Sequence, residues 1–349
     1  VNDKMLSFTY ERRFESHPLY SELWSIRKAI RETSRKRHER ISELKDRTTQ
    51  IEIQINEDLF SQARVVASTL VSSNHRVLSG RKFSTLFIDE AAQALEAACW
   101  IAIRKAERVV LAGDHCQLPP TIKCIDAARG GLSNTLMEKI VTGKPQSVSL
   151  LKVQYRMHQA IMHFPSHWFY SGEVYAAPQV HNRSILDYDT PLVWLDTSGQ
   201  DFQEEFVGDS YGRINKSEAN LLLTELENYI KRIGPKRMLD ERIDFGIISP
   251  YKAQVQYLRN EIKRSRFLRP FKAAITVHTV DGFQGQERDV IFISLVRAND
   301  DGQIGFLSDL RRMNVAITRA RMKLVILGDA STLTKHKFYR ELFEYIKLL

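Results

Sequence analysis

The sequence predicts an α/β protein with doubly wound parallel sheets behind a helical N-terminal segment. Three observations favour this class: apolar runs of four to eight residues, helical stretches between many of them, and a heptad-like pattern near the start. Buried parallel strands joined by crossover helices produce this alternation of short apolar runs and helices.

Residues 18 to 60 are predicted to be helical. Leu23, Ile26 and Ile30 give one apolar stripe, and a second runs from Ile41 to Ile55 at spacings of three and four. Such a seam is typical of a coiled coil, so we expect a long helix or a helical hairpin. A basic run, RETSRKRHER, lies between the two stripes; a solvated helix face explains it better than a nucleic-acid contact.

The apolar, mostly β-branched runs begin at residue 63. Each is expected to be a strand because most end in Asp, Gly, Ser, Thr or Pro. They are residues 63–69, 85–89, 108–114, 147–151, 191–196, 245–250, 273–280, 289–296 and 323–329. Helices are expected at 91–106, 216–233 and 252–264, and TGKPQ at 142–146 is a candidate hinge between two sheets.

Bulk composition excludes several classes of protein. The 349 residues suffice for about two domains, and no stretch approaches the ~20 apolar residues of a membrane span. The three cysteines, Cys99, Cys116 and Cys124, lack the spacing of a zinc site, so reduced thiols are expected and no structural metal. The net charge of +9 is compatible with a polyanionic partner but does not require one.

Two neighbouring apolar runs end in polar residues suited to phosphate chemistry. LFIDEAAQA places Asp89 and Glu90 after a strand, where ligands of a parallel sheet gather. Asp89 could hold Mg²⁺ and Glu90 could deprotonate an attacking water, although helix N-terminal acids would give the same pattern. VVLAGDHCQLPP then offers Gln117 on a short stiff loop, which could sense a γ-phosphate.

Three later segments supply cationic and glycine-rich blocks. VQYRMHQAI carries Arg156, whose planar guanidinium suits phosphate oxygens. In TVDGFQGQERD, Gly282 and Gly285 permit close approach of the backbone to a ligand, and Gln284 and Glu287 could couple a nucleotide to a strand. In NVAITRARMK, Arg319 and Arg321 precede an apolar run, and one of them could act as an arginine finger, often worth ~10³ to 10⁵ in rate.

In this order the five blocks resemble the motifs of superfamily-1 helicases of the nonsense-mediated-decay and immunoglobulin-mu-binding helicase branch. DEAAQALEAACW is similar to motif II, GDHCQLPPTI to motif III, QYRMHQAIM to motif IV, TVDGFQGQERD to motif V and NVAITRAR to motif VI. The resemblance covers roughly residues 60 to 330. It implies two RecA-like domains, the first incomplete: a helical insertion at 1–62, the rest of domain 1 at 63–144, and domain 2 at 145–349.

The resemblance also implies a role for each matching residue. Asp89 and Glu90 match the magnesium ligand and the catalytic base, Gln117 the γ-phosphate sensor, and Arg156 and Arg319 the two phosphate-contacting arginines. Glu287 matches the ribose-binding residue, with Gly285 and Arg321 beside the nucleotide. The residues that match strand-contacting positions are Thr69, Ser249, Pro250, Tyr251, His278 and Thr279.

By the same resemblance, the expected activity is ATP-driven 5′ to 3′ movement on single-stranded DNA or RNA, with duplex unwinding. ATP and Mg²⁺ are the implied cofactors, single-stranded nucleic acid is the implied partner, and the expected location is cytoplasmic. No membrane association is expected, because the sequence has neither an apolar span nor a signal peptide.

One element of such motors is missing: the phosphate-binding loop G-x-x-x-x-G-K-[ST]. Lys82 lacks a glycine five residues earlier, Lys144 is followed by Pro145, and GGLSNT lacks a lysine. We therefore expect the 349 residues alone to be inactive. A truncated or proteolysed protein, suggested by the start without Met, is the first explanation; a naturally degenerate protein, used as a non-catalytic nucleic-acid-binding or regulatory module, is the alternative.

Overall fold

The structure is a computed structural model that describes residues 3–33, 37–208 and 212–349. The chain divides into two compact units: residues 1–86 with 97–110, and residues 87–96 with 111–349. The basic run at 31–40 is only partly covered, since residues 34–36 lie outside the described residues. Among the described residues, no helix is long and apolar enough to cross a membrane.

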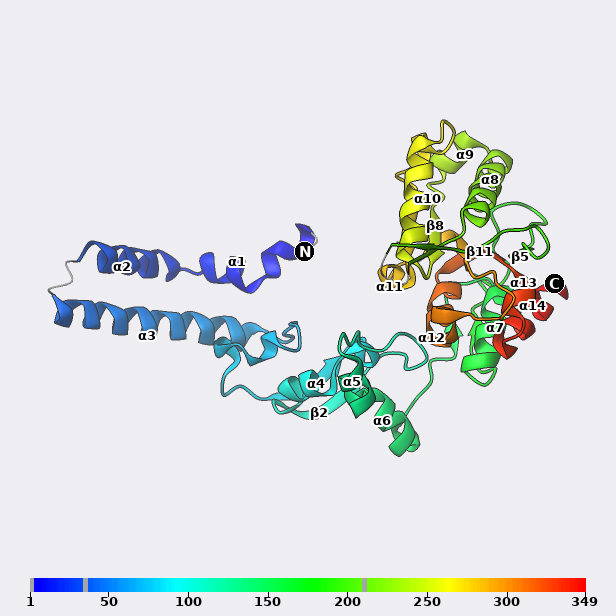
Figure 1. Cartoon of the computed structure of the whole chain (residues 1–349). Coiled ribbons are helices and arrows are strands. Elements are labelled where there is room, and N and C mark those ends of the chain that lie inside the picture. Colours follow the sequence, from blue (N-terminus) through cyan, green and yellow to red (C-terminus); the bar gives the residue numbers. More distant parts are fainter. Residues whose placement is uncertain (1–2, 34–36, 209–211) are drawn as a thin grey trace. The chain divides into compact units, whose positions relative to one another are not determined.

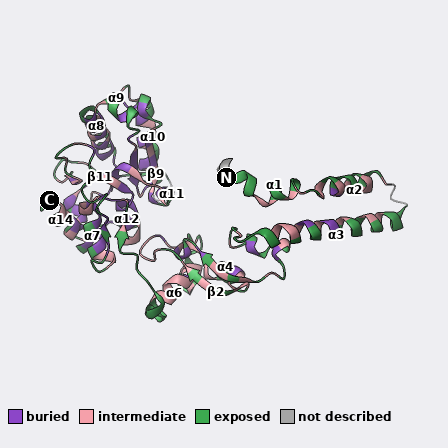
Figure 2. Cartoon of the chain, turned by 180° about the vertical axis from the view of Figure 1, so that it is seen from behind, coloured by how far each residue is buried: buried purple, intermediate pink, exposed green. Residues whose placement is uncertain are grey.

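A helical hairpin begins the chain. The 3₁₀ helix η1 (Asp3–Phe8) and α1 (Tyr10–Glu15) lead into α2 (Tyr20–Glu32), which lies beside α3 (His38–Gln62) (Figure 1). Leu23, Ile51 and Ile55 are fully buried between the helices, as the apolar seam predicts. The hairpin prediction is confirmed, and most of its outer residues are exposed (Figure 2).

A two-stranded sheet follows, formed by β1 (Phe83–Ile88) and β2 (Ala106–Leu111), with η4 (Ala91–Gln93) and α4 (Glu96–Ile103) between them. Phe83 N–H donates to Lys105 O at 2.8 Å and Ala112 N–H to Ile88 O at 2.8 Å. These bonds join like ends of the strands, so the strands are parallel. The carboxyl ends of both strands belong to the second unit.

Short elements connect this sheet to the large one. They are α5 (Ile125–Ala127), the π-helical turn η5 (Ala128–Leu132), α6 (Leu136–Gly143), η6 (Pro145–Ser147), β3 (Val153–Gln154), α7 (Gln159–Phe169) and β4 (Tyr175–Ala176). Two 3₁₀ helices, η2 (Ser72–Asn74) and η3 (Arg76–Leu78), precede β1. Thr135 caps α6, because its hydroxyl accepts from Glu138 N–H while the Glu138 carboxylate accepts from Thr135 N–H. β3 pairs with β4 in parallel.

A five-stranded, all-parallel sheet forms the core of the second unit, in the order β5-β11-β10-β8-β9. Its strands are β5 (Leu192–Asp196), β8 (Phe245–Ser249), β9 (Ile275–Thr279), β10 (Arg288–Ser294) and β11 (Ala320–Gly328). A hairpin of β6 (Glu205–Val207) and β7 (Gly212–Ile214) lies outside this sheet.

Helices cover both faces of this sheet, which is the doubly wound arrangement. They are α8 (Lys216–Ile233), α9 (Pro235–Asp240), α10 (Lys252–Arg264), η7 (Arg269–Phe271), α11 (Val280–Phe283), η8 (Gly305–Ser308), α12 (Leu310–Ile317), α13 (Ala330–Leu333) and α14 (Lys337–Lys347). Phe245, Val290 and Phe292 pack under α8 to α10, whereas Ile291 and Ile293 pack under α7, α12 and α14. Buried side chains of the strands therefore pack on both faces of the sheet.

Two predicted strands are wrong. Residues 63–69 pair with no strand among the described residues, and Val65 is largely exposed. Residues 147–151 also form no strand, and Leu151 is exposed. A β-branched run becomes a strand only where a neighbouring strand takes its N–H and C=O groups, which local sequence does not report.

Candidate nucleotide and nucleic-acid sites

The paired carboxylates lie at the carboxyl end of β1, as predicted. Asp89 and Glu90 follow Ile88 directly and both are exposed. Glu90 has left-handed backbone angles (φ 52°, ψ 38°), and its N–H donates to Asp89 Oδ1 at 2.9 Å. Two adjacent exposed carboxylates on a sharp turn are a fitting donor set for a hard cation such as Mg²⁺.

The loop after β2 packs tightly against this turn. Gly113 has φ 156°, and a Cβ atom placed on it would lie 3.0 Å from Ala91 N and 3.1 Å from Ala92 N. Ala91 N–H also donates to Ala112 O at 2.8 Å. The absence of a side chain at Gly113 thus lets the loops after β1 and β2 approach each other.

Asp114 organises the loop that carries Gln117. Its carboxylate accepts hydrogen bonds from Gln117 Nε2 at 2.7 Å, Tyr170 Oη at 2.6 Å and Cys116 N–H at 2.9 Å. Burial, and then the Asp114 charge, raise the pKa of the Tyr170 hydroxyl, which therefore remains a donor. The side chain of Gln117 is held in place by this network.

Residues of α12 and the segment after it complete the network. Asn314 Nδ2 donates to Tyr170 Oη at 2.7 Å and to Cys116 O at 2.9 Å. Arg319 Nη2 donates to Gln117 Oε1 at 3.4 Å. The predicted γ-phosphate sensor and one predicted phosphate-binding arginine are therefore joined directly.

Arg319 is buried in this structure. Its guanidinium donates to Val315 O at 3.0 Å, Thr318 Oγ1 at 3.0 Å and Gln286 O at 3.3 Å. Burial and the charge of Arg156 lower its pKa to about 10, although Glu287 and Glu90 act in the opposite direction. Arg319 remains charged at neutral pH, and a bound anion would relieve this unfavourable environment.

Arg156, Glu287 and Arg321 form an ion-pair cluster. The Glu287 carboxylate accepts from Arg156 Nε and from Arg321 Nε, the latter at 2.8 Å. Arg156 Nη1 also reaches Thr318 O at 3.1 Å, next to Arg319. Burial alone would raise the pKa of Glu287, but the hydrogen bonds from Arg156 and Arg321 outweigh it and lower that pKa.

All of the predicted nucleotide-binding residues of the large sheet lie at its amino edge. Glu287 immediately precedes β10, and Arg319 immediately precedes β11, whose first residue is paired in register with Arg288. Glu287 and Arg319 are about 30 residues apart in the sequence, but they lie at adjacent positions of neighbouring strands.

Five of the six residues expected to contact a nucleic-acid strand lie at the opposite, carboxyl edge of the same sheet. Ser249 ends β8, followed by Pro250 and Tyr251, while His278 and Thr279 end β9. Ser249 and Tyr251 are buried, whereas Pro250, His278 and Thr279 are partly exposed. Thr69 belongs to the other unit, where its exposed hydroxyl donates to Ser72 Oγ at 2.8 Å.

The two glycines of the TVDGFQGQERD block differ in role. A Cβ atom on Gly282 would lie 2.1 Å from His278 Nδ1, so the chain's own imidazole occupies the space that we expected a ligand to use. Gly285 has φ 74° and no atom near its missing side chain. Gly285 is therefore required by its backbone angle, and that face of it is open.

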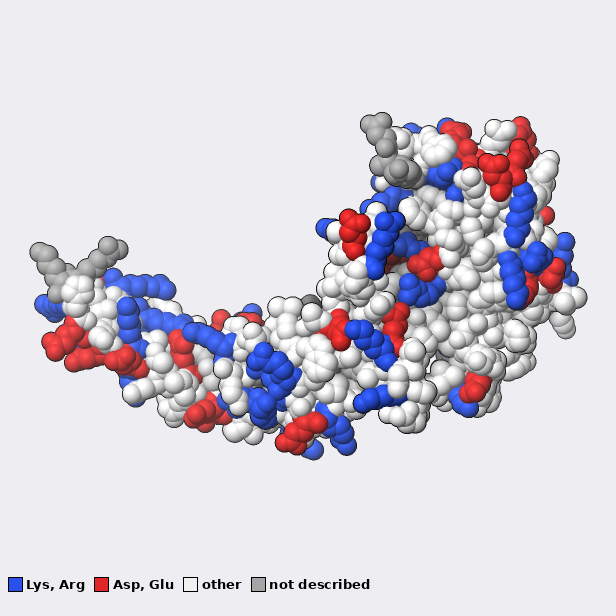
Figure 3. All heavy atoms as spheres, turned by 60° about the horizontal axis from the view of Figure 1, so that its bottom comes forward, with Lys and Arg blue, Asp and Glu red and all other residues white. Residues whose placement is uncertain are grey.

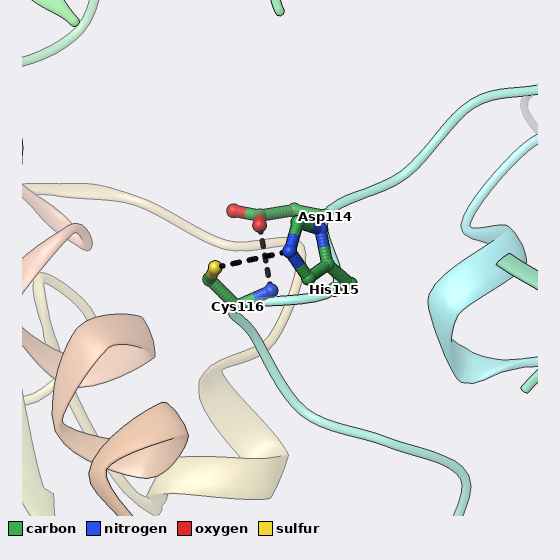
Figure 4. A group of neighbouring side chains, drawn as sticks. All are labelled: Asp114, His115 and Cys116. Carbon is green, nitrogen blue, oxygen red and sulfur yellow. Dashed lines mark hydrogen bonds between the residues drawn. The ribbon is translucent and has the colours of Figure 1, made fainter. Parts of the chain in front are cut away.

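Asp114, His115 and Cys116 are the one group of the described residues with ligand atoms close enough to hold a metal ion, all within 4.8 Å (Figure 4). The Asp114 carboxylate already accepts three hydrogen bonds. Burial and the Asp114 charge raise the pKa of the Cys116 thiol to about 11. This thiol is therefore protonated at neutral pH, and hydrogen bonds within the loop account for the grouping of the three side chains.

Charges of both signs are interspersed on the face drawn in Figure 3, with Lys and Arg beside Asp and Glu. Many charged side chains of the described residues form ion pairs, such as Arg311–Glu138 at 3.2 Å and Arg312–Asp281 at 3.3 Å. On this face, Lys and Arg side chains do not gather into a single basic patch.

Sequence reasoning missed Tyr170, Asn314 and the role of Asp114. Tyr170 follows α7, outside every quoted motif, and its spacing gave no signal. Asn314 lies within the NVAITRAR block, where its amide could have been considered as a link. Their importance comes from long-range hydrogen bonds that local patterns do not encode.

Comparison with known proteins shows which family the chain belongs to. Family profiles described as "AAA domain" match residues 15–124 and residues 132–331. The DNA polymerase alpha-associated DNA helicase A of Saccharomyces cerevisiae is 36% identical over 359 residues, covering 93% of this chain and 49% of that protein.

Two further relatives show the same level of similarity. The regulator of nonsense transcripts 1 homolog of Drosophila melanogaster is 36% identical, covering 83% of this chain and 24% of its own length. The DNA-binding protein SMUBP-2 of Mesocricetus auratus is 36% identical, with 77% and 27% coverage. The chain spans about half or less of the length of these relatives.

The prediction from the five ordered blocks is confirmed by these matches. The fold is consistent with this family, because the sheet is parallel and doubly wound and each block lies next to the end of a strand. The two AAA-domain matches support the same family. The chain belongs to the AAA-domain family of superfamily-1 helicases that includes the regulator of nonsense transcripts 1 and SMUBP-2 proteins.

Proposed function

We propose that this chain is the motor part of an ATP-dependent helicase that moves 5′ to 3′ on single-stranded DNA or RNA and unwinds duplexes. Two RecA-like domains, residues 63–144 and 145–349, would close around ATP and reopen after hydrolysis. The observation that carries this proposal is the convergence of Gln117, Arg156 and Arg319, from three separate segments, around one cluster with Glu287. A cytoplasmic location is part of the proposal.

In the nucleotide site, each side chain would have one task. Asp89 would hold Mg²⁺, which would supply positive charge to the phosphates. Glu90 would orient and deprotonate the attacking water. Arg156 and Arg319 would bind the γ-phosphate and Gln117 would detect it, while Glu287, Gly285 and Arg321 would lie along the ribose.

Nucleotide binding would exchange existing contacts for new ones. Arg156 is already paired with Glu287, and Arg319 with backbone oxygens and Gln117. A γ-phosphate would draw both guanidiniums toward itself, because each gains two charge-assisted hydrogen bonds there. Gln117 would then lose its Arg319 partner, which is a direct way for the loop after β2 to register the nucleotide.

The grip on the nucleic acid would lie at the other edge of the sheet. Pro250 and Thr279 are partly exposed there, supported by the buried Ser249 and Tyr251. The segment from α11 to Glu287 runs from this edge back to the amino edge, since β9 and β10 are parallel to β8. Movement of this segment would couple the strand to the nucleotide.

A second candidate is a non-catalytic nucleic-acid-binding or regulatory module with the same fold. One observation favours it: no stretch of the 349 residues matches G-x-x-x-x-G-K-[ST]. The two candidates differ in ATP turnover. A non-catalytic module would bind nucleic-acid strands and would never hydrolyse ATP, even as part of a longer polypeptide.

The first experiment measures phosphate release by the purified 349-residue chain with ATP, Mg²⁺ and a single-stranded oligonucleotide. We expect no release above background, because the remaining residues would hold a triphosphate poorly without a phosphate-binding loop. Release that increases with the oligonucleotide would overturn this expectation.

The second experiment uses a polypeptide that carries a phosphate-binding loop together with these 349 residues. Turnover there supports the helicase proposal, and its absence supports the non-catalytic module. Glu90→Gln should abolish hydrolysis and leave binding of a fluorescent ATP analogue intact. Glu107→Gln, an exposed carboxylate on β2, is the matched control and should hydrolyse ATP normally; retained turnover in Glu90→Gln removes Glu90 from the role of base.

A further inference from the structure

Phe306 is a large apolar side chain that the fold holds in solvent. It is 52% exposed and lies in η8, within the loop that follows β10. That loop leaves the carboxyl edge of the sheet, the edge that also carries Pro250 and Thr279. An exposed apolar residue alone is ordinary; the surroundings of Phe306 are what distinguish it.

Phe306 contacts one of the two segments proposed to bind the nucleic acid, and Arg312 links it to the other. Its ring centre is 5.6 Å from that of Tyr251, which follows β8, with a tilt of 45° between the planes. The Arg312 guanidinium lies 6.0 Å from the same ring and donates to Asp281, two residues after Thr279, at 3.3 Å. An aromatic face with an adjacent arginine is therefore placed at this edge.

The backbone keeps Phe306 in this position. Gly305 has φ 56°, and a Cβ atom on it would lie 2.3 Å from Arg297 Nη1 and 2.9 Å from Tyr251 Oη. On the other side, Leu307 is buried and its carbonyl accepts from Tyr339 Oη at 2.7 Å. With both neighbours fixed, the Phe306 ring projects outward without a conformational change on binding, which limits the entropic cost of contact.

We propose that Phe306 is a stacking platform for one base of a bound single strand, an inference that rests on the proposed nucleic-acid function. A phenyl ring offers no hydrogen-bonding group, so it would hold any base by its face without reading sequence. Arg312 would add a cation–π contact and positive charge for the neighbouring phosphate.

The test measures binding of a fluorescein-labelled single strand of about 12 nucleotides to the 349-residue chain by anisotropy at low salt. Phe306→Ala should weaken binding by about 5-fold to about 150-fold, the range expected for loss of one base–aromatic stack. Phe306→Trp should keep the affinity. When the oligonucleotide binds, the tryptophan fluorescence of this variant should be quenched more than that of the parent chain. Tyr188→Ala is the matched control, because Tyr188 is a fully exposed aromatic residue next to Asp189, which binds Lys323 near the amino edge.

An abasic strand of the same length separates stacking from phosphate contact. The parent chain should bind it as weakly as Phe306→Ala binds the normal strand, and the substitution should have no further effect on it. Equal binding of the normal strand by Phe306→Ala and the parent chain, with unchanged thermal unfolding, overturns the platform and leaves the proposed function standing. No binding of any strand by the parent chain overturns both.

Discussion

At the scale of single residues, Gly113 shows how one missing side chain shapes the candidate site. We expect Gly113→Ala to lower the free energy of unfolding by about 1–3 kcal/mol, because its Cβ would press on Ala91 N and Ala92 N and its φ of 156° disfavours an L-residue. Urea denaturation followed by circular dichroism measures this change.

Gly143→Ala is the matched control for that substitution. Gly143 ends α6 and has no atom within 4 Å of an added Cβ. Alanine should therefore be neutral or stabilise by about 0.5–1 kcal/mol. Equal effects of the two substitutions would show that the close approach at Gly113 has no energetic weight.

Glu218 is a buried carboxyl group whose titration should make stability depend on pH. It lies in α8, fully buried; its Oε1 accepts from Ser294 Oγ at 2.5 Å and from Val296 N–H at 3.0 Å. Burial raises its pKa from 4.5 to about 7, against the effect of these hydrogen bonds. Val296 has φ 71°, so the bond to Glu218 also holds an unfavourable backbone conformation.

The direction in which stability changes with pH follows from the number of protons that each state binds. Between the unfolded pKa of about 4.5 and the folded pKa of about 7, the folded state binds more protons, so stability is complete below the first value and falls as pH rises through the second. Glu218→Gln should remove up to ~3 kcal/mol of this pH dependence, as measured by urea denaturation at several pH values. If the free energy of unfolding depends on pH in the same way in Glu218→Gln, other groups cause this pH dependence.

The roles of the predicted site residues stay predictions, but the structure shows how some of these residues are connected. Asp89, Gln117, Arg156 and Glu287 stand in blocks whose spacing is informative, and hydrogen bonds or electrostatic contacts now join Gln117, Arg156 and Glu287 to Arg319. Tyr170 and Asn314 could not be predicted, because their roles depend on partners more than 50 residues away, at Asp114 and Cys116.

At the scale of elements, the periodicity of α3 accounts for the hairpin and makes a quantitative prediction. Ile51 is 1% exposed and faces α2, whereas Ile53, two positions later, is 52% exposed. Ile51→Ala should destabilise by about 2–5 kcal/mol, because it leaves a cavity against Leu23. Ile53→Ala should change stability by less than about 0.5 kcal/mol.

Thermal unfolding followed by circular dichroism at 222 nm compares the two variants. The identical substitution on one helix removes helix propensity as a variable. Similar losses from both would mean that the α2–α3 contact contributes little, and that propensity alone maintains α3.

Strand prediction succeeded where a neighbouring strand pairs with the run, both for the fully buried β8 and for the partly exposed β1. The helices α8 and α10 have the bounds predicted from their periodicity, and β8 to β11 lie within about three residues of their runs. The runs at 63–69 and 147–151 are also short and contain β-branched residues, yet no strand pairs with them among the described residues. The residues of a run show that it could form a β-strand, but whether an adjacent β-strand is present to pair with it depends on the whole fold.

At the scale of the whole molecule, the proposed helicase activity uses the amino and carboxyl edges of one sheet. The strands between these edges have five to nine residues. At about 3.3 Å per residue the edges lie roughly 15–30 Å apart, too far for direct contact between nucleotide and strand. Coupling must therefore pass through elements that connect the edges, such as the segment from α11 to Glu287 and helix α12 with Arg319.

The same separation predicts which positive charges matter for nucleic-acid binding. Lys252 begins α10 beside Tyr251 at the carboxyl edge, and Lys263 lies in the last turn of that helix; both are exposed. If the strand binds at the carboxyl edge, Lys252 contacts a phosphate and Lys263, about 16 Å further along the helix, does not. The logarithm of affinity should fall linearly with the logarithm of salt concentration, and Lys252→Ala should reduce the slope by ~0.7, the value for one phosphate contact on a single strand. Lys263→Ala should leave the slope unchanged. A reduced slope for Lys263→Ala alone would place the strand at the amino edge and would reverse the assignment of the two edges.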